Sequence, residues 1–318
     1  MTPSEPEQKL QQIVQRIAPQ GRLLQSWELT GGLSAQMTAL EMLHPDGRTE
    51  RVILRRRGKA GLPEHLQGAA TEFRLLQVLH AAGLAAPRPY HLDVSGEIFP
   101  MPYLVLEYVA GSPEFAPANP IDCSRQMAAH LAGIHRFDGL RPDLSFLPRQ
   151  AQGCTELARR QPAGVATSLD EGRIREALAS TWPSIQRNAP VLLHGDFWPG
   201  NVLWRNGRLV AVIDWEDASL GDPLVDLAIS RLDVAWIFGV EAMQAFTRHY
   251  QALTAIDDRH LPHWDLCAAL RLARLVGSQL TDWAAFFAPL GRTDITELTI
   301  RQGYRFFVDQ ALEKLASR

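Results

Sequence analysis

Cysteine is scarce in this sequence, and its three copies lie far apart. They stand at positions 123, 154 and 267 of a chain of 318 residues. A disulfide-rich secreted domain would need more cysteines, and a zinc site would need them at closer spacing. We therefore expect Cys123, Cys154 and Cys267 to be buried free thiols in a reducing compartment.

Long apolar runs are also missing. No stretch approaches the roughly 20 apolar residues that a membrane-spanning helix needs. The first residues, MTPSEPEQKLQQIVQRI, are polar and acidic, whereas a signal peptide is basic and then apolar. The sequence therefore predicts a cytoplasmic protein with no membrane partner.

An excess of basic charge is absent as well. The chain has 32 Lys and Arg against 35 Asp and Glu, a net charge of −3, so we expect no nucleic-acid partner. Its length exceeds one typical hydrophobic core, which favours two lobes. The sequence contains no repeat and gives no indication of the oligomeric state.

The first hundred residues read mainly as strands separated by turns. Apolar and polar residues alternate in five segments. A helical spacing of apolar residues appears between the third and fourth of them, over 64–83. The expected strands cover 23–32, 34–43, 48–57, 89–99 and 101–111. This part of the chain is therefore predicted to form a five-stranded antiparallel sheet with one helix.

The character of the sequence changes after Gly111. A proline-rich connector leads to Asn119-Pro120, which is a good helix start for 121–137. Long amphipathic stretches follow at 224–252, 262–288 and 294–317, whereas 138–170 is irregular and is given no prediction. The fold class is therefore α+β and bilobal, with an N-terminal lobe over 1–106 and a mainly helical C-terminal lobe over 107–318.

One short hairpin between these helical stretches gathers polar residues. Asn206-Gly207 stands between two apolar runs, which predicts a two-residue type I′ turn. Pairing around that turn places Asn201 opposite Val212, and Asp214 then points to the same face. Such diagonal neighbours have Cα atoms roughly 7–8 Å apart. Two oxygen-bearing side chains at this spacing suit Mg²⁺ when phosphates supply its other ligands.

Asp196 lies in the turn that leads into this hairpin, where it can address a hydroxyl beside the metal. Each of Asp196, Asn201 and Asp214 taken alone is also a common turn or cap residue. All three at separations of 5 and 13 residues are harder to explain in that way. The spacing therefore favours a catalytic and metal-binding hairpin.

The segments around these residues resemble a known family. HGDFWPGN, VIDWED and LGDPLVDLA are similar to motifs of the aminoglycoside phosphotransferase family, which includes choline-kinase-like and homoserine-kinase-like enzymes. The resemblance implies a protein-kinase-like fold, with Asp196 as catalytic residue and Asn201 and Asp214 as metal ligands. It also implies ATP, with GTP as an alternative, Mg²⁺, and a hydroxylated small molecule as acceptor.

The resemblance extends into the N-terminal part of the chain. TGGLSAQ is similar to a glycine loop over the nucleotide phosphates, which implies a role for Gly31, Gly32 and Ser34. By the same likeness the carbonyl of Glu107 and the N–H of Val109, in LVLEYVAG, hydrogen-bond adenine. These residues are all interpreted as parts of the nucleotide site.

The phosphate-pairing cation departs from the family pattern. Position 55 holds Arg where a Lys is typical, and Glu72 on the following helix matches its carboxylate partner. Arg grips phosphate through a planar fork, whereas Lys is a compact point charge. Strand alternation directs Arg55 to one face of its strand and Arg56 to the other. The substitution leaves open a nucleotide-binding pseudo-kinase or regulatory scaffold with little turnover.

The short segment after the metal-binding Asp argues against a protein kinase. Seven residues separate Asp214 from Asp222, too few for an activation segment that binds a peptide. The predicted function is therefore transfer of the γ-phosphate of ATP to an antibiotic, a sugar or an amino alcohol. Trp198 and Trp215 flank the predicted catalytic residues, where an aromatic wall is one interpretation and core packing is the other.

The neighbouring polar residues receive structural interpretations or none. His194 is expected to brace the catalytic loop from the core, and the family resemblance implies that Asp226 hydrogen-bonds the backbone of that loop. Glu216 and Asp217 are left open between a substrate-facing and a solvent-facing position.

Overall fold

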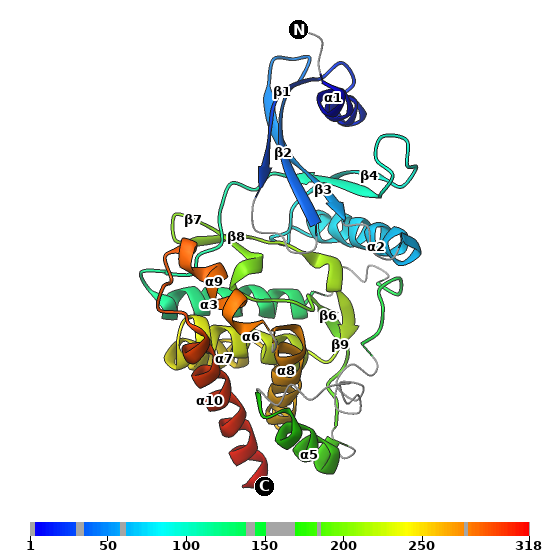
Figure 1. The fold of residues 1–318 in the computed structure, drawn as a ribbon. Coiled ribbons are helices and arrows are strands. Elements are labelled where there is room, and N and C mark those ends of the chain that lie inside the picture. The colour runs from blue at the N-terminus through cyan, green and yellow to red at the C-terminus, as the bar shows by residue number, and fades with distance from the viewer. Residues whose placement is uncertain are drawn as a thin grey trace. The chain divides into compact units, whose positions relative to one another are not determined.

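The computed structural model describes residues 4–29, 35–57, 62–137, 144–150, 169–182, 186–276 and 279–317 (Figure 1). The chain divides into two compact units. The first contains 1–110 together with 211–216, and the second contains 111–210 and 217–318. The two lobes predicted over 1–106 and 107–318 remain a prediction, and each unit is described by itself.

The first unit is built on one antiparallel sheet, as predicted. Its strands run in the order β1-β2-β3-β5-β4. Their bounds are β1 Arg22–Leu29, β2 Ala35–Leu43, β3 Thr49–Arg57, β4 Pro89–Asp93 and β5 Tyr103–Glu107. The predicted helix is α2, Leu62–Ala81, and its buried face includes Ala69, Glu72, Leu76 and Leu79.

The central strand β3 has two different buried faces. Val52 and Leu54 are fully buried in a hydrophobic cluster with residues of β2 and β5. Because successive side chains of a strand alternate, Ile53 and Arg55 project from the opposite face, and both are buried there. Arg56 returns to the first face and lies over the ring of Phe99, 4.5 Å from its centroid. This alternation confirms that Arg55 and Arg56 point apart.

A helix that the sequence analysis did not anticipate precedes the sheet. This is α1, Glu5–Ile17, and a capping box between Ser4 and Glu7 starts it. Ile13 and Val14 are fully buried and complete the hydrophobic cluster on the β3 face of Val52 and Leu54. The N-terminal polar segment is therefore part of the core-forming structure of this unit.

The second unit is mainly helical, as predicted. Its longer helices are α3 Pro120–His135, α5 Glu171–Thr181, α6 Leu224–Ile237, α7 Val240–Leu253, α8 Leu261–Val276, α9 Leu280–Phe287 and α10 Glu297–Ala316. The short elements are β6 Val191–Leu193, η3 Pro199–Asn201, β7 Val202–Arg205, β8 Arg208–Val212, η4 Trp215–Asp217, β9 Ser219–Gly221 and η5 Ala288–Leu290. The end of β8 and most of η4 belong to the first unit. Asn119 caps α3 by accepting a hydrogen bond from the Asp122 N–H at 3.0 Å, which confirms that helix start.

Two of the predicted long helical stretches are interrupted. The stretch 224–252 is two helices, α6 and α7, which meet at Gly239 with φ +95°. The stretch 262–288 is likewise divided between α8 and α9. The helical spacing of apolar residues continues across both breaks, because each helix of a pair buries an apolar face. The sequence pattern therefore does not show where one helix ends and the next begins.

The predicted hairpin is present as β7 and β8. Its two turn residues, Asn206 and Gly207, have φ of +53° and +71°. Positive φ at both central positions is the requirement of a type I′ turn, and Gly meets it without a Cβ clash. This turn prediction is confirmed.

Two expectations from the composition have separate outcomes. Cys123 is a buried free thiol, whereas Cys267 is disulfide-bonded, so the free-thiol expectation is wrong for Cys267. Sequence spacing does not reveal which cysteines approach within the short distance that a disulfide requires.

Within the described part of the chain, no helix is long and apolar enough to cross a membrane.

Candidate active site

Arg55 is the centre of an ion-pair cluster in the first unit. Its Nη1 donates to Glu72 in a short buried ion pair, and its Nη2 donates to Asp214 Oδ1 at 2.6 Å and to Glu216 Oε2 at 2.9 Å. The Arg55 side chain is 4 % exposed and that of Glu72 is 2 % exposed. The residues that the sequence placed together, Arg55 and Glu72, are therefore in contact, and Glu216 joins them.

The charges of this cluster do not cancel. Burial alone would lower the pKa of the Arg55 guanidinium, but the three carboxylates raise it instead, so Arg55 stays protonated. One guanidinium against Glu72, Asp214 and Glu216 leaves a surplus of negative charge. Such a surplus attracts a divalent cation when a nucleotide brings further phosphate charge.

The backbone at Asp214 is in an uncommon conformation. Its φ is +66°, in the left-handed region that few residues other than Gly adopt. Asp tolerates this region better than most, and such conformations concentrate at functional sites. The Asp214 side chain is 33 % exposed, so a ligand can reach the carboxylate.

Glu107 and Val109, the residues predicted to contact adenine, lie at the end of β5 and just beyond it. The Glu107 N–H donates to the Arg88 carbonyl at 2.8 Å, and the Tyr108 N–H donates to the Arg51 carbonyl at 3.4 Å. The Val109 N–H makes no hydrogen bond among the residues that the structure describes. A free donor just beyond the strand end is what the predicted adenine contact needs. Gly31, Gly32 and Ser34 lie outside the described residues.

The loop that carries Asp196 is fastened to α6 in the second unit. The N–H groups of His194 and Gly195 donate to Asp226, at 2.7 Å and 2.9 Å. Ser230 Oγ, one turn further along α6, donates to the Phe197 carbonyl at 2.6 Å. His194 and Asp226 are fully buried. The predicted structural role of Asp226 is confirmed, and His194 lies in the core as expected.

Two features keep this loop in one conformation. Gly195 has φ +86°, and a Cβ there would lie 2.3 Å from the Asp217 carbonyl oxygen, so no other residue fits. Burial alone would raise the pKa of Asp226, but hydrogen bonds from His135 and the loop backbone lower it, so Asp226 stays ionised. An ionised carboxylate that accepts two backbone N–H groups makes strong, charge-assisted hydrogen bonds.

Both carboxylate oxygens of Asp196 are engaged. Asn201 Nδ2 donates to Asp196 Oδ2 at 3.0 Å and to the Asp196 carbonyl at 2.9 Å. Arg271 Nη2, from α8, donates to Asp196 Oδ1 at 2.8 Å. Because both contacts of the Asn201 amide are to oxygen, its orientation is fixed and Nδ2 is the donor. Asn201 Oδ1 then has no hydrogen bond within the described ranges and is available to a cation.

Asp233 adds a second acid beside Asp196 and Arg271. Burial, followed by the negative charge of Asp196, raises the pKa of Asp233 to about 7, and the Trp236 indole donates to its Oδ1 at 3.0 Å. Burial would lower the pKa of Arg271, but the charge of Asp196 raises it. Asp196, Arg271 and Asp233 therefore form one electrostatically coupled group.

The predicted magnesium site has two protein ligands, Asn201 and Asp214. In the part of the chain that the structure describes, no three His, Cys, Asp or Glu side chains are grouped to hold a metal ion. Asp214 belongs to the first unit and Asn201 to the second, so their joint binding of Mg²⁺ remains a prediction. Each offers an oxygen of the kind that Mg²⁺ prefers.

The two tryptophans beside the predicted catalytic residues differ. Trp215 is 2 % exposed, and its Nε1 donates to the Val212 carbonyl at 2.9 Å, so its ring is core. Trp198 is half-buried, with its ring centroid 5.9 Å from that of Phe115 and 5.8 Å from that of Trp283. The aromatic wall suggested by the sequence is therefore confined to Trp198 and its neighbours.

Sequence reasoning missed Arg271 and Asp233 and left Glu216 open. Arg271 stands 75 residues after Asp196, and no motif signals the pairing. Asp233 lies seven residues after Asp226 on α6, on the same helix face two turns further along, which is the one signal that pointed toward the catalytic loop. Glu216 stands two residues after Asp214, and its contact with Arg55 could not be predicted from that spacing alone.

Comparison with known proteins identifies the family. A model described as "Phosphotransferase enzyme family" matches residues 29–270. The chain belongs to this phosphotransferase family. The matched range includes Arg55, Glu72, Asp196, Asn201 and Asp214, and it confirms the family resemblance seen in the motifs.

Individual relatives of this phosphotransferase vary in length and context. It is 24 % identical over 266 residues to acyl-CoA dehydrogenase family member 11 of Rattus norvegicus, which covers 72 % of this chain and 33 % of that protein. The chain thus spans about a third of the length of that relative. It is 30 % identical over 200 residues to viomycin phosphotransferase of Streptomyces vinaceus, covering 57 % of this chain and 66 % of that one.

A solved structure confirms the fold of the phosphotransferase. A spectinomycin phosphotransferase in complex with ADP and spectinomycin matches with a TM-score of 0.64 and 14 % identity. The match covers 96 % of this chain and 98 % of that one. The kinase-like fold predicted from the sequence is therefore present.

Proposed function

We propose that this phosphotransferase moves the γ-phosphate of ATP to a hydroxyl group of a small molecule. The observation that carries the proposal is the set of ion pairs in which Arg55 joins Glu72 to Asp214. In kinases a strand cation paired with a helix carboxylate holds the nucleotide phosphates, and a separate Asp holds Mg²⁺. Arg55 and Glu72 match the first pair, and Asp214 matches the Asp. The family match and the ADP named with a solved relative support the same nucleotide.

The proposed reaction is a single displacement at phosphorus. The acceptor oxygen forms a bond to the γ-phosphorus while the bond from that phosphorus to ADP breaks. Asp196 orients the acceptor hydroxyl and takes its proton. Asn201 and Arg271 donate hydrogen bonds to this carboxylate and keep it in one position. Positioning accounts for much of the catalysis in phosphoryl transfer.

The nucleotide is proposed to use residues of the first unit. Arg55 would pair the α- and β-phosphates, and the Glu107 carbonyl and Val109 N–H would bind adenine. Gly31, Gly32 and Ser34 would cover the phosphates. Asp214 and Asn201 would hold Mg²⁺, which when bound neutralises charge on the transferring phosphoryl group.

The acceptor is proposed to be a hydroxylated small molecule with an apolar or ring-shaped face. The half-buried ring of Trp198, two residues after Asp196, supports such a face. Two of the relatives above, a viomycin phosphotransferase and a spectinomycin phosphotransferase, are named after antibiotics. These names support an antibiotic-like, sugar-like or amino-alcohol acceptor. The absence of a peptide-binding activation segment supports a small acceptor over a protein.

Thermal unfolding with nucleotide is the first test of the proposal. A ligand that binds the native state alone stabilises it by about 2.7 kcal/mol at a concentration of 100 Kd. We expect Mg²⁺–ATP to raise the Tm of the wild type, and Asp214→Ala to lose most of that shift. The absence of a shift at millimolar nucleotide would contradict the proposal. Labelled phosphate should then pass from ATP to at least one member of a panel of hydroxylated amines, sugars and antibiotics.

A nucleotide-binding pseudo-kinase is the second candidate function. It is supported by the contacts of Arg55 Nη2, which already neutralises Asp214 at 2.6 Å and Glu216 at 2.9 Å. In that case nucleotide would raise the Tm while no acceptor on the panel received phosphate. Appearance of transfer in Arg55→Lys, whose side chain lacks the second contacting nitrogen, would identify Arg55 as the reason.

A further inference from the structure

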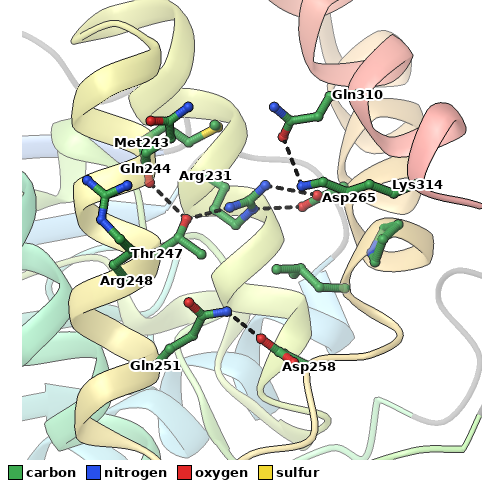
Figure 2. A pocket seen from close by; sticks show the side chains of 12 residues that line it. Arg231, Met243, Gln244, Thr247, Arg248, Gln251, Asp258, Asp265, Gln310 and Lys314 are labelled. Atoms are coloured by element: carbon green, nitrogen blue, oxygen red, sulfur yellow. Dashed lines mark hydrogen bonds and ion pairs between the residues drawn. The ribbon is translucent and has the colours of Figure 1, made fainter.

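The second unit contains a polar cavity of about 350 Å³ among α6, α7, α8 and α10 (Figure 2). It belongs to neither the Arg55 cluster nor the Asp196 loop. Its charged lining consists of Arg231, Arg248, Lys314, Asp258 and Asp265. Three basic against two acidic side chains give the lining a positive excess.

Arg231 forms the innermost part of the charged lining. Its Nε and Nη2 donate to the two carboxylate oxygens of Asp265, at 3.0 Å and 3.1 Å, and its Nη1 donates to Thr247 Oγ1. Figure 2 shows Arg231 between these two partners. The Arg231 side chain is 4 % exposed, and that of Asp265 is 3 % exposed. This pair joins α6 to α8 in the interior.

The guanidinium of Arg231 retains hydrogen-bonding capacity. It has five N–H groups, and three of them are used by Asp265 and Thr247. One N–H on Nη1 and one on Nη2 therefore have no acceptor in the portion of the protein that the structure describes. Buried donors of this kind are normally satisfied, because an unpaired one costs about 1–3 kcal/mol. Because Arg231 lines the cavity, an oxygen bound there is a candidate acceptor for them.

The outer part of the cavity supplies further positive charge. Arg248, on α7, is exposed, and it makes no ion pair or hydrogen bond with any residue within the described ranges. Lys314, on α10, donates from Nζ to Gln310 Oε1 at 3.3 Å, and its charge also acts on Asp265. On the acidic side, Gln251 Nε2 already donates to Asp258. The basic groups of α6, α7 and α10 thus surround one polar space.

We propose that this cavity binds a small anion through carboxylate or phosphate oxygens. The anion accepts hydrogen bonds from Arg231 in the interior and is held by Arg248 and Lys314 at the rim. Arg pairs well with both oxygen types because its planar fork matches their geometry. The site is distinct from the proposed nucleotide site, and its existence does not depend on the proposed function.

Such an anion would brace the two helices on which the Asp196 loop depends. Asp226 and Ser230 on α6 hold the loop backbone, and Arg271 on α8 holds Asp196 itself. The Arg231–Asp265 pair joins these same two helices on another face. Binding at the cavity therefore stabilises the scaffold of the loop without contacting it.

The test is direct calorimetric titration of the full chain with inorganic phosphate and, separately, with malonate, a dicarboxylate. Sodium chloride at matched ionic strength is the reference. We expect at least one of the two anions to bind, and the comparison between them assigns the preferred oxygen type. Arg248→Gln and Lys314→Gln each remove one charge-assisted contact and should weaken that binding about tenfold.

The matched control is Arg305→Gln, on α10 with Lys314. Arg305 is exposed, does not line the cavity, and has no polar partner in the described part of the chain. Its loss removes the same charge and should leave the affinity within about twofold of the wild type. Equal weakening by all three variants would reduce the effect to general electrostatics and overturn the proposal.

Two further outcomes would also overturn it. If neither phosphate nor malonate binds above the chloride reference, water alone fills the cavity. If Mg²⁺–ADP abolishes the binding while Arg248→Gln and Lys314→Gln leave it unchanged, the anion occupies the nucleotide site. The rim variants are exposed substitutions, so they avoid the unfolding that a change at Arg231 would risk.

Discussion

Each unit of this phosphotransferase places an arginine among three acids, but the two arginines are held differently. Arg55 contacts all three of its acids, and its side chain is 4 % exposed. Arg271 donates to Asp196 and is 29 % exposed, and the charges of Asp233 and Asp217 also act on it. Arg55 is therefore part of the core of its unit, whereas Arg271 is partly exposed and orients the carboxylate of Asp196 on a loop.

This difference separates two kinds of mutational effect. Removing one member of a buried ion pair leaves the other charge unpaired in a medium that solvates it poorly. A partly exposed pair is screened by solvent, so its loss has little effect on the free energy of unfolding. Changes around Arg55 should therefore appear first in stability, and changes around Arg271 first in phosphate transfer.

The largest effect is expected for Asp196→Asn in the second unit. The amide keeps the size of the side chain and removes the base, so transfer to the acceptor should fall by about 10²–10⁴-fold. Nucleotide binding should remain nearly unchanged, because Asp196 does not contribute to the Arg55 cluster. Labelled-phosphate transfer and the nucleotide-induced rise in Tm measure the two properties separately. Retention of full transfer would remove Asp196 from the proposed reaction.

Arg55→Met should cause the largest loss of stability. It removes one member of the buried ion pair with Glu72, whose side chain is 2 % exposed, and breaking such a pair typically costs about 3–5 kcal/mol of unfolding free energy. Chemical denaturation measures the difference. Arg55→Lys should recover part of it, because the charge remains.

Arg51→Met is the matched control on the same strand. Arg51 donates from Nε to Glu41 at 2.8 Å, but its side chain is 51 % exposed. A surface pair of this kind contributes about 0–1 kcal/mol. If Arg51→Met and Arg55→Met destabilise the protein equally, the distinction between buried and exposed arginines does not hold.

Local patterns in the sequence were sufficient for the sheet of the first unit and for the turn of the hairpin in the second unit. Alternation along β3 predicted that Arg55 and Arg56 point apart, and Asn206-Gly207 predicted the type I′ turn, because both signals come from neighbouring residues. The capping box of Ser4 and Glu7 was also local, but it was not used, and α1 was missed. The free-thiol expectation failed at Cys267 for the opposite reason, since disulfide formation depends on the fold.

The candidate site could be predicted only where motifs carry it. Asp196, Asn201 and Asp214 lie within one short segment, so their spacing was informative. The pairing of Asp196 with Arg271 depends on the packing of α8 near the loop, which no short segment encodes. Asp233 had a weak signal, since it shares α6 with Asp226, but its raised pKa follows from burial that the sequence does not reveal.

Arg271→Gln tests the prediction for the partly exposed arginine, which is an effect on phosphate transfer with little effect on stability. It removes one charge-assisted hydrogen bond to Asp196, so we expect transfer to fall about tenfold with little change in Tm. A positioning role predicts that kcat falls more than KM rises, because Asp196 remains present but less well oriented. Arg274→Gln is the control: Arg274 is an exposed residue of α8 with no polar partner among the described residues. A fall in Tm without a fall in kcat would show that Arg271 is structural.

The smallest effect is expected for Asp233→Asn, and it depends on pH. The pKa of Asp233 is raised to about 7, above its ordinary value of 3.8. A group whose pKa is raised on folding contributes stability below its unfolded pKa, and this stability is lost as pH rises through the folded pKa. The wild type should therefore lose stability between about pH 4 and pH 7 from this group. The neutral amide has no such loss.

The measurement is the Tm of both proteins from pH 5 to pH 8. At pH 5 protonated Asp233 and the Asn variant should be similar, and at pH 8 the variant should be more stable. Asp233 is only half-buried, and solvent screening reduces the full effect of its raised pKa, so we expect about 1 kcal/mol, or roughly 2–4 °C in Tm. Asp282→Asn, an exposed acid of α9 with no resolved partner in the described ranges, should show no such trend. A constant difference between wild type and Asp233→Asn across the range would contradict the prediction.

The same titration tests whether Asp233 and Asp196 are coupled. Burial is the first cause of the raised pKa of Asp233, and the charge of Asp196 is the second. Asp196→Asn removes that charge, so the pKa of Asp233 should fall toward its ordinary value and the pH-dependent loss of stability should shrink. Burial remains, so the loss should not vanish. An unchanged pH profile in the Asp196→Asn background would mean that the two acids titrate independently, and that Arg271 already screens one from the other.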